Sequence, residues 1–173
     1  MFDEKVRESR RGGRQMPPEE LDAFLRSIQY GTLSYLAEEG WPDARPMNFG
    51  YYNGCLYFHA AKNKGEKLAH WKDGAKVCVS AFEALVDINE KRFGAHHSVL
   101  IYGQLERLDD KPDKAEEAFA AMTAICMGGR APSRAAPENI KNCIHGVGIF
   151  KVVPTHSVGK ITRFSSIPEI LQS

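Results

Sequence analysis

Apolar residues change their spacing several times along the chain, and each change predicts an element. Residues 17–28 open with two prolines and two glutamates and then repeat leucine, phenylalanine and isoleucine at helical spacing. This pattern predicts a short amphipathic helix. From Gly31 the apolar positions recur every second residue, which predicts a strand that ends in a turn at Glu38–Gly40.

A hairpin signal follows this first strand. The run from Ala44 to Tyr52 is strand-like, and Asn53-Gly54 then separates it from the alternating run 56–60. Asn-Gly between two such runs is typical of a two-residue hairpin turn, so we expect two antiparallel strands. Residues 62–67 are polar, and a short helical pattern extends from them through Trp71.

The second half of the chain adds more β-structure and one helix. Apolar β-formers recur over 77–88 and 98–108, and again over 147–153 and 157–164. Residues 109–127 predict a helix with Ala115, Phe119, Met122 and Ile125 on one face, ended by Gly128-Gly129, and a loop follows over 130–142. We therefore expect one domain over residues 1–173, mainly β with flanking α-helices.

Many short antiparallel strands favour a closed or partly closed barrel, because closure removes exposed sheet edges. Strands and helices do not alternate as in a parallel α/β fold, and the sequence contains neither GxGxxG nor GxxxxGK[ST]. These features argue against a Rossmann or P-loop nucleotide site.

Charge and composition describe an ordinary soluble protein. The 173 residues are 43% hydrophobic and 26% charged with a net charge of +1, so no protein-wide field attracts nucleic acid or a membrane. No run approaches the about 18 apolar residues of a spanning helix, and residues 1–14 are charged where a signal peptide is apolar. We expect a cytoplasmic protein. Its arginine-rich arm, residues 1–15, is solvated, packs on a partner subunit or binds nucleic acid.

Cysteine and histidine give no metal or disulfide signal. Cys55 and Cys78 lie in strand-like runs and are expected as buried thiols, while Cys126 and Cys143 flank a loop and are not predicted to pair. His96-His97 would point to opposite faces of a strand, with no third ligand at a suitable spacing. We predict no metal site.

The most informative segment runs from Tyr57 to Lys67. Small residues at a strand end, Ala60 and Ala61, let a bulky ligand approach the backbone. Gly65 then opens a turn whose N–H groups are free to face an anion, and lysines at positions 62, 64 and 67 surround it. These features predict a phosphate site, although lysine-rich turns are also common as solvated surface.

The motifs around this segment occur in a recognisable order. They are Tyr30-Gly31-Thr32-Leu33-Ser34, Gly40-Trp41-Pro42, Arg45-Pro46-Met47-Asn48-Phe49, Tyr57-Phe58-His59-Ala60-Ala61, Gly65-Glu66-Lys67 and Ser98-Val99 with Gly103. Over roughly Arg7 to Lys160 this succession resembles the pyridoxamine 5′-phosphate oxidase-like flavoproteins, and within them it is most similar to the nitroimidazole-resistance, nitroreductase-like branch. The resemblance implies an FMN-binding split β-barrel of antiparallel Greek-key type, a homodimer with FMN at the subunit interface.

The resemblance also implies roles for the motif that begins at Arg45-Pro46. Met47, Asn48 and Phe49 match the strand whose backbone lies along the flavin ring, where N–H and C=O groups pair with its pyrimidine edge. Arg45 is either a surface cation or a phosphate partner.

Two further motifs complete the implied cofactor site. His59, Ala60 and Ala61 match the strand end beside the ribityl chain and phosphate. Ser98 and Val99 match a later strand that closes over the ring.

One departure from the branch affects the phosphate turn. Three residues, 62–64, separate Ala61 from Gly65, where the branch commonly has two. Lys67 with Gly65 matches the phosphate-binding lysine, but the additional residue leaves open whether Lys64 or Lys67 reaches the phosphate.

Two functions remain open at this stage. In the first, an FMN-dependent oxidoreductase passes electrons from a reduced donor such as NAD(P)H to a small, for example nitroaromatic, acceptor. His59 is then a cofactor contact, with a catalytic proton-transfer role or a purely structural role as alternatives. In the second, the same barrel is a non-catalytic carrier or sensor of flavin or haem.

Overall fold

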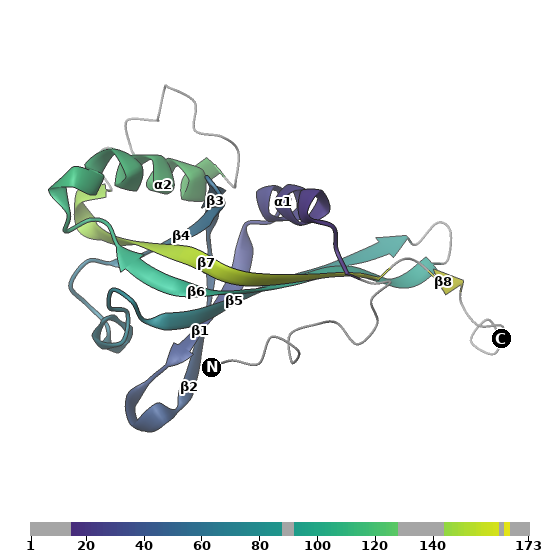
Figure 1. Ribbon diagram of the computed structural model, residues 1–173, viewed down its shortest axis with the longest axis horizontal. Coiled ribbons are helices and arrows are strands. Elements are labelled where there is room, and N and C mark those ends of the chain that lie inside the picture. Colours follow the sequence, from purple (N-terminus) through teal and green to yellow (C-terminus); the bar gives the residue numbers. More distant parts are fainter. Residues whose placement is uncertain (1–14, 88–91, 128–143, 163–164, 167–173) are drawn as a thin grey trace.

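The computed structural model describes residues 15–87, 92–127, 144–162 and 165–166 (Figure 1). The helices are α1 (Pro18–Ser27) and α2 (Ala115–Met127), and the short 3₁₀ turns are η3 (Glu38–Gly40), η4 (Glu66–Ala69), η5 (Pro112–Lys114) and η6 (Ile144–Gly146). The strands are β1 (Tyr30–Leu36), β2 (Pro42–Asn48), β3 (Gly50–Tyr52), β4 (Cys55–Ala61), β5 (Lys76–Asp87), β6 (Arg92–Arg107), β7 (Val147–Thr162) and β8 (Ser165–Ser166).

One antiparallel sheet contains all the described strands. Its order is β2-β1-β5-β6-β7-β4-β3, and β8 pairs with β6. The sheet curls into a barrel that stays open, because the described strands β2 and β4 do not pair with each other. In Figure 1 the helices lie on one side of the long β5–β6–β7 ribbon, and the β1–β2 hairpin projects on the other. The predicted mainly antiparallel split barrel is confirmed.

The predicted N-terminal helix is confirmed as α1. Pro18 occupies its first turn together with two glutamates, which suits both the missing N–H of proline and the helix dipole. Phe24 and Leu25 are buried, and Arg26 pairs with Asp22 at 2.7 Å on the solvent side. The amphipathic pattern therefore places this helix correctly.

The Asn53-Gly54 hairpin is also confirmed. Both residues have positive φ, 48° and 71°, as the tight turn between β3 and β4 requires. The single strand expected over 44–52 is wrong, because the chain breaks at Phe49. The buried Phe49 side chain enters the core and its N–H donates to the Gln29 carbonyl at 2.8 Å, so β2 pairs with β1 while β3 pairs with β4.

The two strands expected over 147–153 and 157–164 form one continuous strand, β7. Pro154, which cannot donate to the ladder, lies at a shift in register opposite Tyr102 and Gly103. Gly103 has no room for a side chain there, since a Cβ would approach the Val153 carbonyl oxygen to 2.4 Å. The bulge absorbs the proline without ending the strand.

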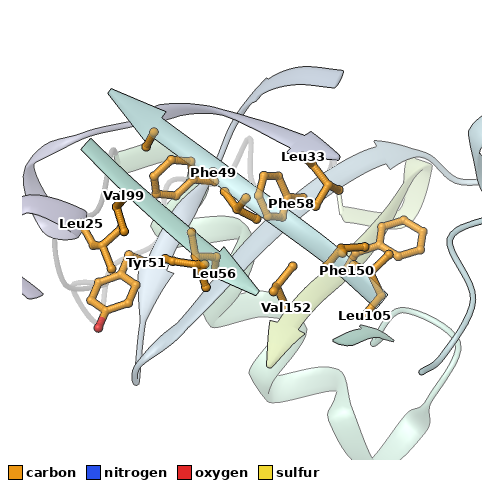
Figure 2. Close-up of a cluster of buried hydrophobic side chains, with 14 of the residues drawn as sticks. Leu25, Leu33, Phe49, Tyr51, Leu56, Phe58, Val99, Leu105, Phe150 and Val152 are labelled. Carbon is orange, nitrogen blue, oxygen red and sulfur yellow. The ribbon is translucent and has the colours of Figure 1, made fainter. Parts of the chain in front are cut away.

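Two hydrophobic clusters stabilise the barrel. The larger fills the inside of the curled sheet, where Leu33, Phe49, Phe58 and Phe150 meet (Figure 2). The smaller lies between the sheet and α2 and includes Tyr57. Tyr57 lies on the face of β4 opposite Phe58, and α2 covers that face, so both Phe58 and Tyr57 are buried.

The predicted apolar face of α2 is confirmed in part. Met122 and Ile125 are buried and Phe119 packs against them, whereas Ala115 is exposed. Cys55 and Cys78 are half-buried instead of buried. The predictions for residues 1–14, 128–142 and Cys143 lie outside the described residues. No helix in the described part is long and apolar enough to cross a membrane.

Candidate functional site

The η4 turn fixes Lys67 against the wall of the barrel. Gly65 enters this turn with φ of 107°, a conformation that favours glycine, and its carbonyl accepts the Leu68 N–H at 3.2 Å. The Lys67 ammonium lies 5.0 Å from the centroid of the Trp71 ring, and Trp71 is itself packed edge-on against Phe150. The lysine predicted for the phosphate turn is therefore held on a rigid aromatic base.

Arg45 approaches the same region from β2. In the β1–β2 register it lies opposite Leu33, so its side chain leaves the sheet on the inner face. Its guanidinium donates to the Asp43 carboxylate at 2.8 Å and to the Tyr35 hydroxyl at 3.3 Å. The buried Tyr35 in turn donates to Asp43 at 2.5 Å and packs edge-on against Trp71. Tyr35 and Asp43 thus hold Arg45 in place.

Three basic side chains, Arg45, His59 and Lys67, converge here, and we call them the basic cluster. Burial lowers the pKa of Lys67, and the Arg45 charge lowers it further. Burial also lowers the pKa of His59, with a smaller contribution from the Lys67 charge. Among the described residues no carboxylate lies within ion-pair distance of the Lys67 ammonium. The cluster therefore suits an anion.

His59 carries an unused polar atom. Its Nδ1 is buried and forms no hydrogen bond within the described part of the chain. An unpaired buried nitrogen costs about 1–3 kcal/mol, which a ligand able to hydrogen-bond it would recover. The lowered pKa makes the imidazole neutral at pH 7, so it either donates or accepts according to its tautomer.

The edge of β4 next to the cluster is open. β7 pairs with residues 56–61, but β3 pairs only with 55–57, so residues 58–61 have a strand neighbour on one side within the described chain. Ala60 is buried and Ala61 exposed, and neither side chain is large. A flat ligand with polar edges has access to the free main-chain groups of this segment.

The predicted site residues near the end of β2 and in the turn after β4 differ in how accessible they are. Met47 and Asn48 are half-buried and Pro46 is exposed at the end of β2, beside the opening. The Phe49 side chain belongs to the core and its N–H is already bonded, so the residue has only its carbonyl to offer. Lys64 is exposed.

Ser98 and Val99 are not brought to the cluster within one chain. Val99 is 2% exposed and packs in the core, while Ser98 pairs with Phe82 and Lys160 on the outer face of the sheet. Arg45 of the basic cluster instead leaves the sheet on the inner face. The residues that sequence reasoning missed are Tyr35 and Asp43, which only the hairpin register places beside Arg45. No group of three potential metal ligands occurs in the described part of the chain.

A split antiparallel barrel with a basic cluster at its open edge defines a class of small-ligand or cofactor-binding split-barrel proteins. Within this class the chain belongs to the pyridoxamine 5′-phosphate oxidase family, whose sequence model matches residues 17–160. No curated protein matches the sequence significantly.

Solved structures share the fold at low sequence identity. A candidate 5-nitroimidazole antibiotic resistance protein from Bacteroides thetaiotaomicron is 20% identical, covers 87% of this chain and 86% of its own, and has a TM-score of 0.62. A conserved hypothetical protein from Mycobacterium tuberculosis is 15% identical, with coverages of 93% and 98% and a TM-score of 0.71. An FAD and haem binding protein from Mycobacterium smegmatis is 20% identical, with coverages of 90% and 76% and a TM-score of 0.65.

Proposed function

We propose that this chain binds FMN, with the phosphate at the basic cluster and the ring along the opening between β2 and β4. The observation that carries the proposal is the convergence of Arg45, His59 and Lys67 on an unpaired strand edge, with no carboxylate in the described chain within ion-pair distance of Lys67. Phosphate matches this charge and accepts hydrogen bonds from all three side chains. Family membership and the FAD named for the M. smegmatis protein support a flavin ligand.

Lys67 is the better candidate than Lys64 for the phosphate contact. Lys67 is half-buried and stacked on Trp71, so little side-chain freedom is lost when it meets an anion. Lys64 is fully on the surface and would lose its conformational freedom on binding. We therefore expect the additional residue before Gly65 to leave the phosphate contact with Lys67.

The proposed activity is that of an oxidoreductase that takes electrons from a donor such as NAD(P)H and passes them to a small acceptor such as a nitroaromatic. Bound flavin would supply the redox chemistry. The chain's own residues bind and orient: the basic cluster anchors the phosphate, and the end of β2 and the free edge of β4 exclude water from one side. Neutral His59 has an Nδ1 able to hold a hydrogen bond to the ligand.

We further propose a homodimer in which each cofactor site is completed by the second copy. Large apolar residues exposed on the outer face of the described sheet include Tyr30 (69%), Phe82 (61%), Leu100 (40%) and Val153 (40%). The registers place all four on one face, together with Ser98. An apolar face of this extent on a soluble protein is typical of an interaction surface. A twofold contact through it would bring Ser98 of one copy towards the ligand of the other.

A carrier or sensor without turnover is the second candidate function. The observation that favours it is that the M. smegmatis relative is described by its ligands, FAD and haem, and not by a reaction. Such a protein would need the same cluster and the same open edge.

Absorbance of the purified protein, followed by anaerobic addition of NADPH, tests these proposals. A flavin spectrum that bleaches with NADPH and recovers with a nitroaromatic supports the oxidoreductase. A flavin spectrum that no donor bleaches supports the carrier. A colourless protein that does not bind added FMN contradicts both flavin proposals.

The lysine assignment needs paired variants. Lys67→Ala should weaken the free energy of FMN binding by about 1.5–3 kcal/mol, the range for a hydrogen bond to a charged group. The matched variant Lys64→Ala should leave the affinity unchanged. The opposite result would move the phosphate contact to Lys64.

A further inference from the structure

A cavity of about 440 Å³ lies between α2 and the sheet. Its floor is apolar and rigid, since Leu108, Ile149 and Ala118 are each at most 4% exposed. Phe119 and Ile144 form its walls. A concave apolar space of this size is typical of a small-molecule site.

The charges at the rim of this cavity are not equivalent. The Asp109 carboxylate is 5% exposed and accepts hydrogen bonds from the Arg107 guanidinium at 2.9 and 3.1 Å and from the Ile149 N–H at 3.0 Å. Its acceptor capacity is largely used. Lys111 is similarly committed, because its ammonium lies 2.7 Å from Asp73.

The Lys62 ammonium at the rim of this cavity is available to donate hydrogen bonds to a ligand. Its ammonium lies 3.7 Å from Asp109, beyond hydrogen-bond distance, and its side chain is 39% exposed. Its main chain is fixed at both ends, since its carbonyl accepts from Arg107 at 3.1 Å and its N–H donates to the Gly146 carbonyl at 3.4 Å. A fixed backbone therefore presents a half-solvated ammonium at the edge of an apolar cavity.

We propose that this cavity binds a small aromatic carboxylate, with the ring between Phe119 and Ile149 and the carboxylate at the Lys62 ammonium. An apolar body fits the floor, and one negative charge complements Lys62, which of the two described lysines in the lining is the one without a carboxylate at hydrogen-bond distance. The second lining carboxylate, Asp110, faces the Arg107 guanidinium at 3.8 Å. Lys67, Arg45 and His59 do not line this cavity, although His59 lies opposite Ile149 in the β4–β7 register. The site therefore adjoins the proposed flavin site without sharing its basic cluster. Its occupancy does not depend on flavin binding.

Binding of 1-naphthoate to the purified full-length protein, followed by calorimetry or ligand-observed NMR, tests the proposal. We expect saturable binding with the same affinity before and after FMN is added. The uncharged analogue 1-naphthalenemethanol should bind more weakly. Absence of saturable naphthoate binding, or displacement of naphthoate by FMN, would overturn the proposal.

Variants of cavity residues distinguish binding inside the cavity from nonspecific binding elsewhere on the protein. Lys62→Gln should lower the affinity for naphthoate about tenfold, because a charge-assisted contact is lost. The affinity for the uncharged analogue should not change. Lys72→Gln removes an exposed lysine elsewhere and should change neither. Ala115→Leu narrows the cavity from an exposed position on α2, where the fold tolerates it, and should weaken both probes. Equal effects of Lys62→Gln and Lys72→Gln, or unchanged binding in Ala115→Leu, would contradict this location.

Discussion

Tyr35 is the residue on which the geometry of the proposed phosphate contact depends. Its hydroxyl bridges the Asp43 carboxylate and the Arg45 guanidinium, and burial and the bond to Asp43 raise its pKa, so it stays protonated at neutral pH. An arginine restrained in this way is ready for an anion, whereas a free one would lose side-chain entropy on binding.

We therefore predict that Tyr35→Phe lowers the affinity for FMN about three- to tenfold, which corresponds to the loss of one ordinary hydrogen bond. Riboflavin, which lacks the phosphate, should bind unchanged, and both affinities are measured by fluorescence quenching. Tyr52→Phe, a half-buried tyrosine at the hairpin, is the matched control. Equal weakening of FMN and riboflavin by Tyr35→Phe would show a general packing defect instead of a role in placing Arg45.

His59 gives a prediction about pH. Its pKa in the free protein lies below the ordinary value, through burial and the Lys67 charge, and a phosphate beside it would raise that pKa again. The complex then holds more protons than the free protein, so FMN affinity should rise as pH falls from 8.5 to 6.5. Below this range the phosphate itself takes up a proton, with a pKa of about 6, and the gain ends.

Titrations of FMN at pH 6.5, 7.5 and 8.5 measure this slope. His59→Asn keeps a hydrogen-bonding side chain but does not titrate, and it should bind FMN with a flatter pH dependence. A slope that is the same in wild type and His59→Asn would show that another group takes up the proton.

At the scale of elements, α2 is positioned by one glycine. A Cβ at Gly50 of β3 would lie 2.6 Å from the Ile125 nitrogen and 2.7 Å from the Ala124 carbonyl carbon. The helix backbone therefore touches the strand directly, and the half-buried ion pair of Lys151 with Glu117 at 2.6 Å ties the other end of α2 to β7.

Gly50→Ala should destabilise the protein by about 1–3 kcal/mol, because helix and strand must move apart to admit the methyl group. Chemical denaturation followed by circular dichroism measures the free energy of unfolding. Gly146→Ala, where a Cβ meets nothing within 4 Å, should change it little and serves as the control. A stable Gly50→Ala variant would mean that α2 shifts more easily than this contact suggests.

Most elements were predictable from the sequence because their signals are local. The prolines and glutamates of α1 and the Asn53-Gly54 turn act within a few residues, and the structure confirms both. Lys67 could be predicted as a phosphate contact because a glycine turn and a lysine lie close together in sequence, and the family resemblance supports the same residue; this role stays a prediction.

The remaining features depend on contacts distant in sequence. The break at Phe49 arises because its side chain reaches the core formed with Phe58, and alternation alone continues through it. Tyr57 is buried only because α2, some 60 residues further on, covers it and offers Glu117 to its hydroxyl at 3.0 Å. Likewise, the partnership of Tyr35 with Arg45 follows from the register of the hairpin and not from either residue's neighbours.

At the scale of the whole molecule, the curled sheet has one face filled by the core and a second face that α2 covers over β4 and the start of β7 but leaves exposed over β5 and β6. The barrel interior holds the apolar residues of Figure 2, while Phe82, Leu100 and Val153 face outward from β5, β6 and β7. Small residues, among them Ser80 and Ser98, lie between them in the register. This outer surface is the one on which the proposed dimer would form.

Leu100→Lys should therefore dissociate the dimer, because a charge buried in the middle of an apolar interface cannot be solvated there. Sedimentation velocity at micromolar protein should show the mass halved relative to wild type. Ala23→Lys adds the same charge on the exposed side of α1 and should leave the dimer intact. FMN affinity should fall together with dimerisation in Leu100→Lys if Ser98 of the second copy completes the site. A monomeric wild type would contradict the proposed dimer, and a monomeric Leu100→Lys with full FMN affinity would show that each chain holds its cofactor alone.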